Sequence, residues 1–275
     1  MKEAKTIVVC NQKGGVGKTV TSMCLGVALA QQGRKVLLCD FDAQGNLTKG
    51  LGYADRHAYR YSLRDVLLDT VNERDGNWKD YVLQTDERVD LIPANISLAG
   101  TDLQLASVMS RETILRRFLE LPKTYYDYII IDSNPALNLF TINSLTAADS
   151  VIIPVQAEPY ATDGLNDLLH TIRNAKKQLN PALQIDGIVL TLTDARTNLS
   201  RHIESEIRSM YGGSIRVFNT VIPRCVKAAE ASLAGESPMK YAPRSEVAKA
   251  YQDLTKEVVR QHGKAITAPE QRSVR

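Results

Sequence analysis

The sequence has no long hydrophobic run and few cysteines, and both shortages limit what the protein can be. No apolar stretch reaches the about 18 residues that a transmembrane helix needs. Residues 1–5 lead directly into a strand, without the apolar region of a signal peptide. The four cysteines form no C-x-x-C pair, so neither a disulfide framework nor a structural zinc site is predicted. We therefore expect a soluble, cytoplasmic protein with no membrane partner.

A strong overall charge is also lacking, since the formal net charge is only +3. The charge is nevertheless uneven along the chain. Residues 1–195 carry 20 Lys and Arg against 23 Asp and Glu, whereas residues 196–275 carry 14 against 8. A basic last third is compatible with a nucleic-acid surface. A solvated basic helix face explains the excess about as well on charge alone.

What the sequence does contain is a glycine-rich loop between a predicted strand and a predicted helix. The apolar residues 7–9 are followed by Cys-Asn-Gln-Lys-Gly-Gly-Val-Gly-Lys-Thr at residues 10–19. Three glycines let consecutive backbone N–H groups turn inward at a helix N-terminus, which favours bound phosphate. Lys18 would neutralise phosphate charge and the Thr19 hydroxyl would hold Mg²⁺. The strict pattern G-x-x-x-x-G-K-[ST] is not met, because Gln12 occupies the position of its first glycine.

The segment after this loop predicts a parallel sheet. Small and apolar residues at 21–30 indicate a helix that ends near Gly33, and a strand follows at 35–39. Two strands joined by one helix form a right-handed βαβ unit. Because ligands collect at the carboxyl ends of such strands, Asp40 and Asp42 should lie at the same edge as the glycine loop.

A second aspartate-terminated strand lies about 115 residues further on. Tyr-Tyr-Asp-Tyr-Ile-Ile-Ile at residues 125–131 runs into Asp132, as a Walker B element requires for holding Mg²⁺, commonly through a water. A buried strand that happens to end in Asp would look the same. Its occurrence together with the glycine loop favours the functional interpretation.

The rest of the chain continues the alternation of strands and helices. We predict an α/β P-loop NTPase fold with a twisted, mostly parallel sheet flanked by helices on both faces. Residues 1–262 should form a single domain, and residues 263–275 a polar, disordered tail. Helices are predicted at about 96–107 and 110–121, after a short or edge strand at 89–93.

Several segments together resemble the ParA/Soj partition ATPases, which belong to the deviant Walker A class of P-loop ATPases. The extra lysine of that class matches Lys13. The family's D-x-D-P-Q-x-N segment matches residues 40–46, with Ala43 in place of proline. Its D-A-R-T-N-L segment matches residues 194–199, and its I-P-R-x-V-R segment matches residues 222–227. These signals occur in the family's order along almost the whole chain.

The resemblance implies roles for particular residues. Lys13 and Asp42 would be catalytic: the lysine would reach the phosphates of a partner's nucleotide, and the aspartate would orient the attacking water. A strand-end aspartate such as Asp42 is also often only a turn residue or helix cap. The residues expected to bind ATP are Lys13, Gly14, Gly15, Val16, Gly17, Lys18, Thr19, Val20 and Pro223. Those expected to hold Mg²⁺ are Thr19, Asp42 and Asp132, and those expected to contact DNA are Arg196, Arg224 and Lys227.

The function implied by this resemblance is ATP-dependent partition of a chromosome, plasmid or mobile element. ATP would join two copies into a homodimer, the dimer would bind double-stranded DNA of any sequence on the nucleoid, and hydrolysis, stimulated by a ParB-like centromere-binding protein, would release it. A MinD-like membrane-associated ATPase is the alternative. It requires a C-terminal amphipathic helix, and residues 261–275 contain only two bulky aliphatic residues together with Pro269. An iron–sulfur carrier would require bridging cysteines, and none is suitably placed.

Overall fold

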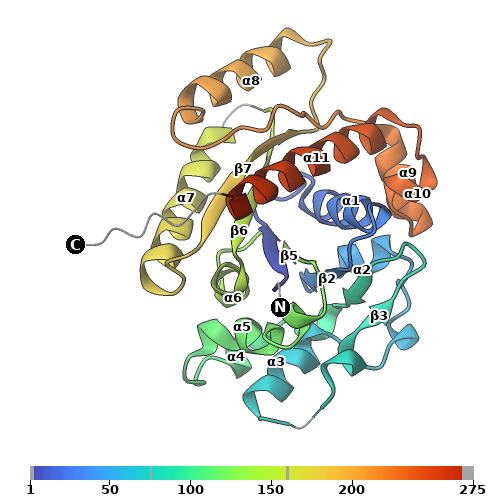
Figure 1. The fold of residues 1–275 in the computed structure, drawn as a ribbon, viewed down its shortest axis with the longest axis vertical. Helices are drawn as coiled ribbons and strands as arrows, with labels where there is room; N and C mark the ends of the chain where they lie inside the picture. Colours follow the sequence, from blue (N-terminus) through green and yellow to red (C-terminus); the bar gives the residue numbers. More distant parts are fainter. Residues whose placement is uncertain (1–2, 75, 159–160, 268–275) are drawn as a thin grey trace.

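The core of the molecule is a seven-stranded sheet with the strand order β3-β4-β2-β5-β1-β6-β7 (Figure 1). The computed structural model of the chain describes residues 3–74, 76–158 and 161–267. Neighbouring strands are parallel except at one edge, where β3 runs antiparallel to β4. The strands are β1 (Lys5–Val9), β2 (Val36–Phe41), β3 (Leu83–Gln84), β4 (Asp90–Ile92), β5 (Tyr128–Ser133), β6 (Ser150–Gln156) and β7 (Gln184–Thr191).

Helices cover both faces of this sheet, which confirms the predicted fold class (Figure 1). The α-helices are α1 (Lys18–Gln31), α2 (Asn46–Gly50), α3 (Leu63–Val71), α4 (Thr101–Gln104), α5 (Ile114–Leu119), α6 (Leu139–Ala147), α7 (Ala161–Gln178), α8 (Asn198–Tyr211), α9 (Val226–Ala234), α10 (Pro238–Tyr241) and α11 (Glu246–Thr267). The short 3₁₀ helices are η1 (Arg56–Ala58), η2 (Trp78–Tyr81), η3 (Ile96–Leu98), η4 (Arg111–Thr113) and η5 (Pro122–Thr124).

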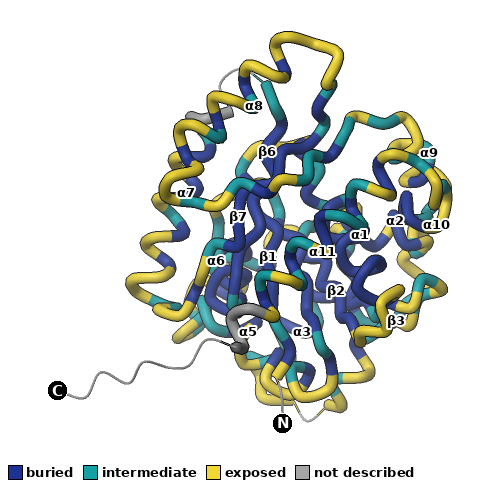
Figure 2. The backbone as a smooth tube through the Cα atoms, turned by 45° about the horizontal axis from the view of Figure 1, so that its top comes forward, coloured by how far each residue is buried: buried dark blue, intermediate teal, exposed yellow. Residues whose placement is uncertain are grey.

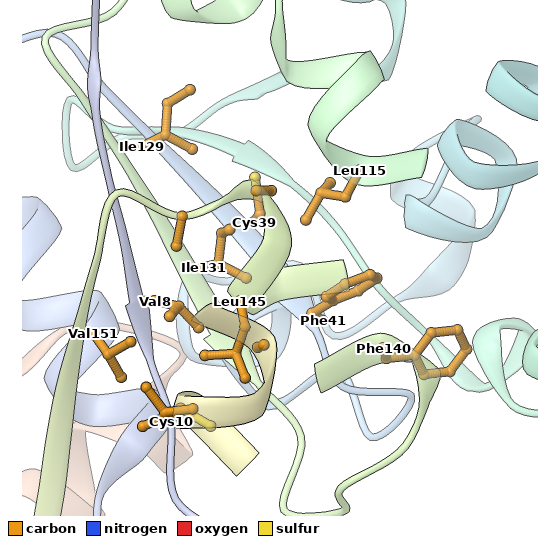
Figure 3. Packing of buried hydrophobic residues seen from close by; sticks show 14 of the residues in the cluster. Val8, Cys10, Cys39, Phe41, Leu115, Ile129, Ile131, Phe140, Leu145 and Val151 are labelled. Atoms are coloured by element: carbon orange, nitrogen blue, oxygen red, sulfur yellow. The ribbon is translucent and has the colours of Figure 1, made fainter. Parts of the chain in front are cut away.

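The side chains of β1 alternate between two hydrophobic clusters, one on each face of the sheet. Ile7 and Val9 pack in the cluster that contains α1 and α11, whereas Val8 packs in the cluster that contains α3, α5, α6 and α7. Figure 3 shows Val8 in this second cluster, together with Leu115 of α5 and Leu145 of α6. All of these side chains are fully or almost fully removed from water. The alternation follows from the two-residue period of a strand that is covered on both sides.

Helix α1 is buried between the sheet and the C-terminal helix. Its small residues allow this close packing: Gly26 lies against Leu38 of β2, where an added Cβ would come within 2.6 Å of the Leu38 Cδ2 atom. On its other side, the Thr21 Oγ1 atom lies 3.0 Å from the hydroxyl of Tyr251 in α11, and both residues are buried. Helix α1 is thus packed against the sheet on one side and α11 on the other, and the glycine loop directly precedes its N-terminus.

The strand register brings the functional segments to one edge. Asp132 at the end of β5 is paired with Val9 of β1 on one side and with Asp40 of β2 on the other. The glycine loop leaves β1 directly after Val9. The carboxyl ends of three neighbouring strands therefore supply the loop and two aspartates to the same place, as the βαβ argument predicts.

The two helices predicted at about 96–107 and 110–121 are wrong. The segments 96–107 and 110–121 do not form two regular helices but the short pieces η3, α4, η4 and α5. Gly100 and Ser110, with φ of 78° and 55°, adopt left-handed backbone conformations that interrupt the helical pattern. Strand β4 is short, as expected, but β3 lies outside it and forms the edge.

The predicted boundary of the C-terminal tail also differs from the structure. Helix α11 continues to Thr267, whereas the tail was predicted to begin at residue 263. Residues 268–275, the remainder of the predicted tail, lie outside the described residues. None of the described helices combines the length and the apolar composition needed to cross a bilayer.

Replacing Gly26 by Ala should destabilise the protein, because the new methyl group would overlap Leu38 in a closely packed interior. We expect the free energy of unfolding to fall by about 1–2 kcal/mol. Gly164→Ala is the matched control, since a Cβ at Gly164 in α7 meets no atom within 4 Å. That change should raise the free energy of unfolding by about 0.5–1 kcal/mol. Urea denaturation of the nucleotide-free protein measures both, and equal effects would contradict the packing argument.

Candidate functional site

The glycine loop forms a backbone cradle at the N-terminus of α1. Gly15 and Gly17 have φ values of 74° and 84°, which L side chains rarely adopt, so these positions require glycine. Gly17 is the N-cap of α1, and no side chain caps this helix end. The first N–H groups of a helix and its dipole attract an anion. The cradle therefore suits a phosphate group, as the sequence predicts.

Lys18 lies inside this cradle rather than on the surface. Its side chain is largely buried, and its Nζ atom donates a hydrogen bond of 3.1 Å to the carbonyl oxygen of Lys13. Burial lowers the pKa of Lys18, and the nearby negative charge of Asp132 opposes this shift. The ammonium group is thus held beside the cradle by a backbone acceptor, and it lies close enough to Asp132 to be influenced by its charge.

Asp40 and Asp132 form a pair of buried carboxyl groups on neighbouring strands. Burial raises the pKa of Asp132 to about 7, with a further increase from the charge of Asp40, while hydrogen bonds from Thr19 and Ser22 lower it. Burial raises the pKa of Asp40 to about 6, against the lowering effect of hydrogen bonds from Thr48. The Ser22 Oγ atom lies 3.0 Å from Asp132 Oδ1, and the Thr48 backbone N–H donates to Asp40 Oδ2 at 2.8 Å.

This donor set fits a magnesium ion. The Asp132 carboxyl group and the Thr19 hydroxyl supply hard oxygen ligands of the kind that Mg²⁺ prefers, and a cation beside them would offset the repulsion between Asp132 and Asp40. Across the described residues, no group of three or more His, Cys, Asp or Glu side chains is placed to hold a metal. A cation here would need further ligands from phosphate or water, which is usual for Mg²⁺.

Asp42 lies at the mouth of the same site. Its Oδ1 atom accepts a hydrogen bond of 2.9 Å from the Gln44 N–H, and its carbonyl oxygen accepts one from Gly45. Asp42 therefore stabilises the turn after β2 through these hydrogen bonds, and it also lines the cavity next to the glycine loop. The geometry is compatible with both interpretations of Asp42 given by the sequence.

A cavity of about 820 Å³ joins most of the predicted nucleotide-site residues. Its wall includes Gly14, Gly15, Gly17, Lys18, Thr19, Val20 and Asp42. The opposite wall is formed by Leu192 and by Arg224 with the first turns of α9. Val16, Pro223 and Asp132 are not part of the cavity wall: the Val16 carbonyl accepts a hydrogen bond from Thr191, and Pro223 pairs with Thr193 beside Arg224. The cavity is large enough for a nucleotide.

Lys13 is not part of the cavity wall, and its side chain contacts the loop after β6. Its Nζ atom lies 3.0 Å from Glu158 Oε2, and the two side chains are 46% and 43% exposed. Glu158 follows β6 at the same edge of the sheet, and its Oε1 atom lies 3.9 Å from Arg224 Nη2. The sequence offered no motif for Glu158. Its position two residues after a strand end was the one available signal.

The three residues predicted to contact DNA lie around this edge, each beside a carboxylate. Arg196 is 90% exposed and donates two hydrogen bonds, of 2.9 and 3.0 Å, to Asp194. The hydrogen bonds from Arg196, with a smaller effect of Arg224, lower the pKa of Asp194 to about 2. Lys227 donates to Glu230 in the next turn of α9 at 2.8 Å. The exposed residues of α8 and α9 can be followed in Figure 2.

Three buried residues of the site were missed or left without a role by the sequence. Asp40 was placed at the correct edge, but nothing distinguished it from a structural strand residue. Ser22 and Thr48 contact the two buried carboxylates, and hydroxyl residues within helices carry no signal of such a contact. Thr48 also accepts a hydrogen bond from the Ala94 N–H, so it links Asp40 to the loop after β4.

Comparison with known proteins places the chain among ATPases and partition proteins. The family model described as "AAA domain" matches residues 4–185. The sporulation initiation inhibitor protein Soj of Bacillus subtilis is 48% identical over 92% of this chain and 98% of its own length. The chromosome partitioning protein ParA of Caulobacter vibrioides is 39% identical over 93% of this chain and 94% of its own.

A solved structure supports the same fold. The cobyrinic acid a,c-diamide synthase from Mycobacterium smegmatis, with bound ATP analog and magnesium, superposes with a TM-score of 0.83. It is 35% identical, and the match covers 97% of this chain and 98% of that protein. The similarity thus extends over almost the whole chain.

The two buried carboxyl groups should make stability depend on pH. Both pKa values are raised above the ordinary 3.8, so between about pH 4 and pH 7 the native protein keeps protons that the unfolded chain has released. Stability should therefore fall as pH rises through this window. Asp132→Asn should reduce the fall by at least about 1 kcal/mol, since one pKa unit corresponds to about 1.4 kcal/mol. Urea denaturation at pH 5 and pH 8 without Mg²⁺ measures this, and equal falls in both proteins would refute it.

Proposed function

The chain belongs to the Soj/ParA family of partition ATPases, and we propose that it binds ATP with Mg²⁺, dimerises around the nucleotide and, as a dimer, binds DNA without sequence preference. Hydrolysis of ATP then returns it to a form that releases DNA. The main support for this proposal is that the glycine cradle and Asp132 lie together at the carboxyl ends of neighbouring strands, in a chain 48% identical to Soj. The cargo would be a chromosome, a plasmid or another mobile element.

Nucleotide binding follows from the charges at the cradle. The phosphates would accept hydrogen bonds from the loop N–H groups at the start of α1, and Lys18 would offset their negative charge. Thr19, Asp132 and Asp42 would hold the magnesium ion, directly or through water. When bound, the ion neutralises charge that develops on the phosphate oxygens. Val16 within the loop and Val20 in the first turn of α1 would lie beside the phosphates, and Pro223, which is outside the cavity wall of the single chain, would approach the nucleotide next to Arg224.

Hydrolysis requires a water molecule positioned to attack the γ-phosphate and a positive charge that neutralises the negative charge developing on its oxygens. Asp42, at the cavity mouth, is the side chain proposed to orient that water. The Lys13 side chain is half-exposed and the residue lies outside the cavity wall of its own chain, so we propose that it leaves Glu158 and approaches a nucleotide held by a second copy. Its charge would then be supplied across the dimer, which makes hydrolysis dependent on dimerisation.

DNA binding is proposed for the exposed cations beside this edge. Arg196, Arg224 and Lys227 would contact phosphates, which fixes position but reads no sequence. One copy of such a surface binds weakly, and two copies joined in a dimer gain from avidity. Nucleotide-driven dimerisation would thereby control DNA binding on the nucleoid. A ParB-like protein bound to a centromere site is the proposed stimulator of hydrolysis.

The direct test of this function is the ATPase rate, measured with and without DNA and with a ParB-like protein encoded near the chain's gene. Stimulation by both is expected. Sedimentation with ATP distinguishes the MinD-like alternative. Binding to liposomes and not to DNA would exclude partition by this mechanism, whereas binding to DNA alone would support it.

Lys18→Ala should abolish nucleotide binding, because it removes the buried cation beside the cradle. Lys13→Ala is the matched control, since it removes a half-exposed lysine of the same loop that is not part of the cavity wall. This control should keep nucleotide binding and lose ATP-dependent dimerisation. Fluorescent-nucleotide titration and size-exclusion chromatography report the two properties. ATP-dependent dimers in the Lys18 variant would refute the role given to that residue.

Arg196→Glu should weaken binding to double-stranded DNA by at least about tenfold at physiological salt, since it reverses a charge on the phosphate-contacting surface in both copies of the dimer. ATP-dependent dimerisation should be unchanged, because Arg196 is fully at the surface and outside the cavity wall. Filter binding over a salt series measures the affinity. An unchanged affinity would place the DNA surface elsewhere.

A further inference from the structure

Lys13 forms an ion pair with Glu158 of the same chain. The ammonium group lies 3.0 Å from Glu158 Oε2, so it already has an anionic partner when no nucleotide is bound. Lys13 belongs to the loop after β1, whereas Glu158 follows β6, the neighbouring strand. The pair therefore spans two loops at the edge of the sheet where the nucleotide cavity opens.

The Glu158 carboxylate is held in place from its other side. Gln156, the last residue of β6, is largely buried, and its Nε2 atom donates a hydrogen bond to Glu158 Oε1. The Glu158 N–H donates to the Gln156 carbonyl at 2.8 Å, which makes a tight turn at the strand end. Arg224 lies 3.9 Å from the same Oε1 atom. With Oε1 engaged in this way, Oε2 is the oxygen that faces Lys13.

We propose that Glu158 restrains Lys13 in the nucleotide-free protomer and so raises the nucleotide concentration at which the dimer forms. This inference rests on the proposed function, in which Lys13 engages the phosphates of a second copy. A single ammonium group cannot stay on Glu158 and also bind a phosphate on the partner. The carboxylate and the partner's nucleotide therefore compete for it.

The restraint is weak enough to be released. Ion pairs between half-exposed side chains contribute at most about 1 kcal/mol, so the competition changes an equilibrium by up to about fivefold. Arg224 remains beside Glu158 after Lys13 leaves, so the carboxylate keeps a cationic neighbour. Release of Lys13 therefore leaves no isolated charge, and the contact can form again when the nucleotide is lost.

The test is Glu158→Gln in the full chain, which keeps the side-chain shape and removes the charge. Dimer formation is followed by analytical ultracentrifugation during titration with Mg²⁺ and AMPPNP, a non-hydrolysable ATP analogue. We expect the midpoint to fall by about two- to fivefold. Glu236→Gln is the matched control, because it removes the carboxylate of another half-exposed pair, with Lys240 at 3.1 Å. This control should keep the wild-type midpoint.

The outcomes separate this inference from the proposed function. A wild-type midpoint in Glu158→Gln overturns the restraint alone, and a higher midpoint also overturns it, because Glu158 would then position Lys13 for the partner. Absence of AMPPNP-dependent dimers in the wild type overturns both the proposed function and the restraint. Glu158→Ala should shift the midpoint in the same direction as Glu158→Gln. Thermal unfolding of each variant verifies that it is folded.

Discussion

Two carboxyl groups buried side by side are the constraint on which the site depends. Asp40 and Asp132 are register partners on β2 and β5, and neither is accessible to water. Burying one ionised carboxylate is costly, and burying two neighbours is more so. The surrounding structure supplies partial compensation through the hydroxyls of Ser22 and Thr48 and the ammonium group of Lys18. The remaining need for positive charge explains why a nucleotide site with a divalent cation belongs at this edge.

The fold and the centre of the site could be predicted from the sequence because their signals are local. A strand, three glycines and Lys-Thr specify the cradle, and apolar runs that end in aspartate specify the neighbouring strands. Residues 96–121 could not be predicted in the same way. Their apolar spacing is helical, but the left-handed backbone at Gly100 and Ser110 divides the segment, and nothing in the periodicity reveals that conformation. The contact of Glu158 with Lys13 could not be predicted either, because the two residues are 145 positions apart in the sequence and come together only in the folded chain.

The excess of Lys and Arg over Asp and Glu in residues 196–275 is weaker evidence for DNA binding than the net charge alone suggests. Arg196, Arg224 and Lys227 each lie near a carboxylate of the same chain: Asp194, Glu158 and Glu230, respectively. A DNA phosphate would have to compete with these carboxylates rather than meet free cations. Because the pairs are exposed, each holds its cation only weakly, and the competition favours a polyanion that offers many phosphates at once.

Arg224 connects the two halves of the proposed function. Its backbone N–H donates to the Thr193 carbonyl at 2.9 Å, so the segment before α9 is fixed against the end of β7. Its side chain lines the nucleotide cavity, lies near Glu158 and lowers the pKa of Asp194. One guanidinium group cannot neutralise a nucleotide phosphate, Glu158 and a DNA phosphate together. A nucleotide bound in the cavity would therefore reduce the positive charge of Arg224 that remains for a DNA phosphate. The contacts that link the two sites are already present in the single chain.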